Sequence, residues 1–190
     1  ASITSLPSGV SGSSLVLIST QTASSSATID FTSGIDSTYK EYIIKCINVH
    51  PATNEQNFTF QADTGTNTNY NQTITSTFFR AYNQENDGGT ALGYLTSRDQ
   101  AQGTSFQPLT VTIGNGNDEC TNGTIHLFDP SNTTFVKHFV SRFIDYEGGN
   151  QAVDNYCGGY FNTTTAITRV QFKFASGNID AGTFKLYGVV

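Results

Sequence analysis

The chain has 190 residues, a mass of 20.5 kDa and a net charge of −6 at neutral pH, and this length predicts one domain. Only 9 residues are Lys or Arg, and charged residues make up 13% of the chain, about half the usual share. Binding to nucleic acid or to an anionic membrane needs clustered cations, so the composition argues against both classes of partner. The sequence has no run of about 18 apolar residues, so we expect no transmembrane helix.

The beginning of the sequence carries neither the basic segment nor the apolar segment of a signal peptide. Ala1 together with the absence of Met fits a chain from which the initiator Met was removed, which predicts synthesis in the cytoplasm. Cys46, Cys120 and Cys157 form no CxxC motif and no Cys/His spacing suited to zinc. We therefore expect three free thiols.

Residue types that favour strands dominate the chain, and several windows alternate apolar and polar residues with period 2. No window carries an apolar stripe of helical spacing over three turns. Residues 42–49 carry apolar side chains at odd and at even positions, and therefore on both faces of a strand. This pattern predicts a central strand that is covered on both faces. In chain order, the predicted strands are 15–18, 27–31, 42–49, 57–61, 74–82, 109–113, 124–128, 135–146, 169–174 and 183–189.

Turn-forming residues separate these strands at short intervals and are densest at 62–70, 83–89, 114–118 and 147–159. About ten short strands with such spacing predict a single antiparallel β-sandwich over residues 15–190, jelly-roll-like in its connections. Residues 1–14, rich in Ser and Gly, form a predicted irregular N-terminal arm. Two further hairpin turns are predicted, one in the loop at 114–119 and one that starts at Ser176-Gly177-Asn178.

The sequence contains no recognised catalytic motif. His50, His126 and His138 stand beside no Ser, Cys or acid in a known pattern. The oxygen-rich loop at 114–119 lacks the residue spacing of a calcium loop. We therefore expect no catalytic residue, no metal, no cofactor and no enzymatic activity. A glycosidase remains an alternative, because its two carboxyl groups are brought together by the fold and not by the sequence.

A carbohydrate site would need aromatic rings for stacking, and the chain has no Trp. Tyrosines near predicted loops would have to supply those rings. The candidates are Tyr70, Tyr82, Tyr94, Tyr156 and Tyr160.

The end of the chain, residues 167–190, contains the strings Ser176-Gly177-Asn178-Ile179, Gly182-Thr183-Phe184 and Leu186-Tyr187-Gly188. This segment resembles the C-terminus of a group of tailed-bacteriophage virion proteins. The string from Ser37 to Val49, with Tyr39 and Tyr42, is similar to an earlier strand of the same group, and a looser similarity extends over residues 15–190.

The resemblance implies a non-enzymatic structural protein of the virion, assembled after synthesis in the host cytoplasm. A capsid decoration (cement) protein that binds the major capsid protein is the expected role, and such proteins commonly form homotrimers. Ile3, Leu6 and Val10 would then be the apolar partner contacts of the N-terminal arm. The alternative is a head or tail fibre module that binds a host receptor or a carbohydrate.

Overall fold

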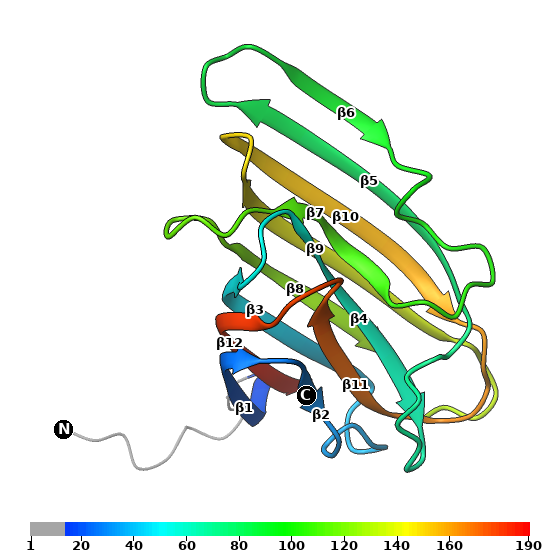
Figure 1. The fold of residues 1–190 in the computed structure, drawn as a ribbon. Coiled ribbons are helices and arrows are strands. Elements are labelled where there is room, and N and C mark those ends of the chain that lie inside the picture. Colours follow the sequence, from blue (N-terminus) through cyan, green and yellow to red (C-terminus); the bar gives the residue numbers. More distant parts are fainter. Residues whose placement is uncertain (1–13) are drawn as a thin grey trace, which may run out of the picture.

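Residues 14–190, the part of the chain that the computed structural model describes, form twelve strands in two layers (Figure 1). All strand pairs are antiparallel, which confirms the predicted all-β antiparallel sandwich. Within these residues there is no helix, and so none that is long and apolar enough to cross a membrane. The jelly-roll connectivity and the domain boundary after residue 14 stay predictions.

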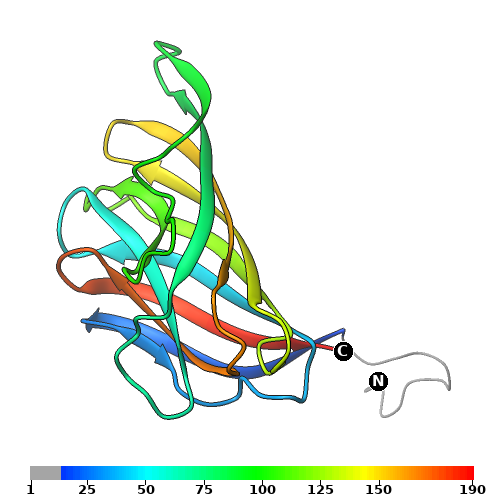
Figure 2. The same ribbon diagram turned by 90° about the vertical axis from the view of Figure 1, so that its right-hand side faces the viewer.

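The two sheets differ in width, with eight strands in one and four in the other. In spatial order, the larger sheet consists of β1 (Leu15–Ser26), β12 (Ile179–Val189), β3 (Glu41–Pro51), β8 (Thr121–Phe128), β9 (Lys137–Glu147), β10 (Gln151–Phe161), β5 (Ile74–Gln84) and β6 (Thr90–Tyr94). The smaller sheet consists of β2 (Ile29–Phe31), β11 (Ile167–Phe174), β4 (Gln56–Thr64) and β7 (Gln107–Ile113). The smaller sheet leaves β6 and part of β5 extending beyond it (Figures 1 and 2).

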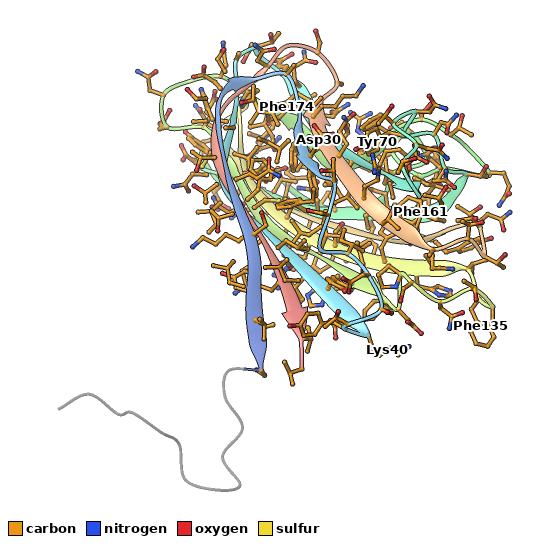
Figure 3. The ribbon with its side chains drawn as sticks, turned by 90° about the horizontal axis from the view of Figure 1, so that it is seen from below. Asp30, Lys40, Tyr70, Phe135, Phe161 and Phe174 are labelled. Carbon is orange, nitrogen blue, oxygen red and sulfur yellow. The ribbon has the colours of Figure 1, made fainter. Side chains whose placement is uncertain are left out.

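Phenylalanine rings fill the space between the sheets. Phe58 of β4 stacks on Phe172 of β11 with ring centroids 5.8 Å apart, and it contacts Phe143 of β9 and Phe184 of β12 at 5.7 and 6.0 Å. All four rings are fully buried. Phe174 belongs to the same layer (Figure 3). The period-2 pattern that predicts the strand at 169–174 therefore also identifies its buried face correctly.

Asp145 of β9 is a carboxyl group buried in this core. Its Oδ2 accepts a hydrogen bond from Asn155 Nδ2 at 2.6 Å, while its Oδ1 has no partner among the described residues. The Oδ1 of Asn155 in turn accepts a hydrogen bond from the backbone N–H of Val111 in β7 at 3.2 Å. Asp145 and Asn155 therefore link the larger sheet to the smaller one. Burial raises the pKa of Asp145 to about 8, and the nearby carboxylates of Glu147 and Asp154 act in the same direction.

The strand β10 replaces a predicted loop. Turns are predicted over residues 147–159, where Gly158 and Gly159 disfavour a strand. This prediction is wrong, because residues 151–161 form β10, which lies between β9 and β5. A Cβ at Gly159 would lie 2.6 Å from the backbone oxygen of Thr75 and 3.0 Å from the ring of Phe139. Glycine is required there for close packing and not for a turn.

The two glycines provide a matched test of that interpretation. Gly159→Ala is expected to lower the free energy of unfolding by about 1–3 kcal/mol, because the added methyl group meets rigid backbone. Gly158→Ala is expected to be neutral or to stabilise by up to about 1 kcal/mol, since its Cβ would have only ordinary contacts at 3.8 and 3.9 Å. Urea denaturation of both variants measures the difference. Equal effects at the two positions would contradict the assigned packing.

At two predicted hairpin turns, the strands before and after the turn belong to different sheets. β11 and β12 flank the turn at 175–178, yet β11 pairs with β2 and β4 while β12 pairs with β1 and β3. The loop at 114–119 similarly leads from β7 in the smaller sheet to β8 in the larger one. Both hairpin predictions are wrong, because a turn signal reports only the reversal of the chain and not the partner of each strand.

The outer face of the smaller sheet is covered by the chain itself. Gln61 of β4 is fully buried, and its Nε2 donates to the carbonyl oxygens of Gln72, Thr104 and Ser105 at 3.0, 3.3 and 3.1 Å. These acceptors belong to the segments 65–73 and 95–106, which lie over the sheet. Among residues 14–190, these segments therefore cover the outer face of the smaller sheet at β4.

Candidate docking face

The outer face of the larger sheet, here called the docking face, carries apolar side chains in solvent. β9 alternates strictly: Val140 and Ile144 are 47% and 50% exposed, while their neighbours Phe139 and Phe143 are buried. Antiparallel partners point to the same side of a sheet, so the register extends this face across the strands. Its exposed large apolar residues are Leu17, Ile47, Phe79, Leu92, Tyr94, Phe128, Val140 and Ile144.

This arrangement corrects the interpretation of residues 42–49. β3 is central in its sheet, between β12 and β8, but only one of its faces is covered. Tyr42, Ile44 and Cys46 are buried, whereas Ile43 is only half-buried and Ile47 is exposed on the docking face. Ile43 and Ile47, the apolar residues on the opposite side of the strand, therefore lie at the surface and not in a second core.

Two lysines stand opposite each other on the docking face. Lys45 of β3 is the register partner of Lys185 of β12, and directly opposed like charges destabilise a sheet. Lys45 Nζ lies 5.3 Å from the centroid of the Tyr187 ring, and neither lysine forms an ion pair within residues 14–190. In a chain with a net charge of −6, this uncompensated basic pair favours an acidic partner.

Aromatic side chains lie on the part of the docking face that β10 and β5 form. Tyr156 of β10 and Phe79 of β5 stack face to face with centroids 4.8 Å apart, and the guanidinium of Arg142 lies 5.2 Å from the Tyr156 centroid on β9's side. Arg142 also forms a bidentate pair with Asp154, with Nη2 to Oδ2 at 2.7 Å. These hydrogen bonds hold the pKa of Asp154 below its usual range. The faces of the Tyr156 ring are thus occupied within the protein.

A shallow hollow of about 400 Å³ lies on the docking face between β5, β9 and β10. Val140, Tyr160 and Thr77 form its walls, and the backbone of Gly158 and Gly159 forms its floor. The missing side chain of Gly158 leaves the hollow open, because a Cβ at this position would point toward Val140. The lining is mostly apolar and open to solvent. A projecting apolar side chain of a partner would fit this hollow.

The tyrosines named as stacking candidates do not meet in one cleft. Tyr94, Tyr156 and Tyr160 lie on the docking face, where Tyr94 and Tyr156 donate hydrogen bonds to Asp99 and Asp154. Tyr70 is 5% exposed and lies over the smaller sheet. The Tyr82 ring packs against the guanidinium of Arg80, 5.1 Å away.

The three histidines occupy separate polar contacts. His50 Nδ1 is 2.6 Å from the carbonyl oxygen of Glu119, His126 Nδ1 is 2.6 Å from Glu41 Oε1, and the ring of His138 lies 6.0 Å from that of Tyr160. In residues 14–190, no three His, Cys, Asp or Glu side chains form a group that could hold a metal ion. The absence of enzymatic activity, metal and cofactor stays a prediction.

The remaining candidate residues have clear positions or lie outside the described part. Ile3, Leu6 and Val10, the predicted partner contacts, lie outside residues 14–190. Cys46, Cys120 and Cys157 are unpaired, as expected, and Cys46 and Cys157 are buried. Sequence reasoning missed the docking face, although the apolar residues on the second face of the strand at 42–49 were a signal for it.

No model of a protein family matches the chain, and no curated protein matches it at a significant level. The resemblance to phage virion proteins therefore rests on residues 37–49 and 167–190 alone.

Proposed function

We propose that this chain is a non-enzymatic structural protein of a bacteriophage virion, which decorates the capsid by placing its docking face against the outer shell. The observation that supports this proposal most strongly is the difference in coverage between the outer faces of the two sheets. Segments of the chain cover the smaller sheet, whereas the larger sheet exposes apolar side chains across its strands. Contiguous exposed apolar surface rimmed by polar residues is typical of protein interaction sites.

The chemistry of the docking face defines the partner surface. Burying Val140, Ile144 and the hollow beside them would supply the hydrophobic contribution to binding. Lys45 and Lys185 call for carboxylates on the partner, since an acidic group between them would offset their mutual repulsion. A capsid shell that presents apolar residues flanked by Asp or Glu satisfies both requirements.

Replacing Ile144 with glutamate is the first test of the proposal. The change removes an exposed apolar side chain and places a negative charge against the acidic partner, so we expect capsid affinity to fall at least about tenfold. Co-sedimentation with capsids lacking the protein measures the affinity.

Thr66→Glu is the matched control, because Thr66 is also exposed to solvent but lies in the segment over the smaller sheet. We expect this variant to bind capsids like the unchanged protein. Equal loss of affinity in both variants, or in neither, would contradict the docking face. A chain that ignores capsids but binds host cells or glycans would instead support the fibre module.

A further inference from the structure

The strand β6 is an exposed edge of the larger sheet. It pairs with β5 alone and stands clear of the smaller sheet (Figures 1 and 2). All five of its residues are exposed, and Leu92 is 74% exposed. Proteins commonly protect such edges with charges, proline or a bulge. β6 has no charge and no proline, and its register with β5 is continuous.

The hydrogen-bond pattern of β5 and β6 shows which backbone groups point outward. Just past β6, Leu95 N–H donates to the Phe78 carbonyl at 2.9 Å. Hydrogen-bonded pairs alternate along an antiparallel ladder, so Gly93 turns its N–H and C=O toward β5. Leu92, one residue earlier, turns its N–H and C=O toward the free edge.

We infer that two copies of this chain pair through β6, antiparallel about a two-fold axis at Leu92. Each Leu92 then meets its own counterpart in the other copy, and Thr90 meets Tyr94. All three residues have their backbone groups on the free edge, so the Leu92 pair and both Thr90–Tyr94 pairs can each exchange two hydrogen bonds. The side chains of Leu92 and Tyr94 are buried against the second copy on the docking side of the joined sheets.

Charge complementarity at the two ends of β6 favours a second copy as the occupant. The turn before β6 carries exposed Glu85 and Asp87, and the turn after it carries Arg98. Antiparallel pairing places the first turn of one copy beside the second turn of the other, twice by symmetry. The Arg98 side chain is half-buried, and its Nε is buried without a partner among residues 14–190. The same turn also carries Asp99, which accepts a hydrogen bond from the Tyr94 hydroxyl at 2.5 Å.

The inference predicts a weak dimer, because a five-residue strand contact is smaller than a standard stable interface. Sedimentation velocity of the purified full chain, from low to high micromolar concentration, should show its mass rise from 20.5 kDa toward twice that value. Leu92→Lys should abolish this rise by opposing two charges on the axis. Phe135→Lys, which adds the same charge at an exposed site outside β6, should leave the rise unchanged.

A cysteine pair identifies the axis independently. Leu92→Cys should give a disulfide-linked dimer under mild oxidation, while Phe135→Cys should remain monomeric. A chain that stays monomeric at every concentration, a dimer that persists in Leu92→Lys, or a species of three times the chain mass would each overturn the inference. Because no capsid is present, these outcomes are independent of whether the chain decorates a particle.

Discussion

Replacing Phe172 with alanine is expected to lower the free energy of unfolding by about 3–5 kcal/mol. The Phe172 ring is fully buried and touches rings from both sheets, with centroid distances of 5.8 Å to Phe58 and 5.6 Å to Phe184. The variant loses the burial of the ring and leaves a cavity that these neighbours, fixed on facing sheets, cannot fill completely.

Urea or guanidinium denaturation measures this loss, with Phe135→Ala as the control. Phe135 is 67% exposed and projects from the rim of the sandwich (Figure 3), so its replacement should change the free energy of unfolding by less than about 0.5 kcal/mol. A loss below about 1 kcal/mol for Phe172→Ala would mean that the two faces of β11 are assigned in reverse.

Replacing Asp145 with asparagine is expected to remove a pH dependence of stability. Burial raises the pKa of Asp145 to about 8, against an ordinary value of 3.8. Between these two values the folded protein holds a proton that the unfolded chain releases, so the free energy of unfolding falls as the pH rises. The slope approaches about 1.4 kcal/mol per pH unit and levels off above the folded pKa.

Asparagine is a neutral mimic of the protonated carboxyl, and its side-chain oxygen can still accept the hydrogen bond from Asn155. Denaturation of both proteins at several pH values from 5 to 9 measures the effect. The Asn variant should gain stability over the unchanged protein by several kcal/mol between pH 5 and pH 8. A constant difference across this range would show that Asp145 is ionised in the folded protein.

The sequence predicts strands where one face is buried and the other is polar. In β11, Val170, Phe172 and Phe174 alternate with polar residues, so both the strand and its buried face are predicted correctly. In β4 the strand is predicted, but Thr59 and Gln61 are buried as well as the phenylalanines. Distant segments cover these polar residues, and a local pattern carries no information on such contacts.

Two strands, β10 and β6, were not predicted from the sequence, each for a different physical reason. β10 contains two adjacent glycines, which signal a turn locally but serve close packing against β5. β6, from Thr90 to Tyr94, is short, contains Gly93 and buries neither face, so it lacks any alternation. The docking face was missed because exposed apolar residues such as Val140 and Ile144 read as core residues until the position of the second sheet is known.

Cryo-electron microscopy of the decorated particle tests the central claim most directly. The account predicts density for this chain on the outside of the capsid, with the larger sheet toward the shell and Val140 and Ile144 in the contact. Carboxylates of the shell should lie near Lys45 and Lys185. A particle in which the segments over the smaller sheet face the shell, or in which the chain is found only on the tail, would contradict the account.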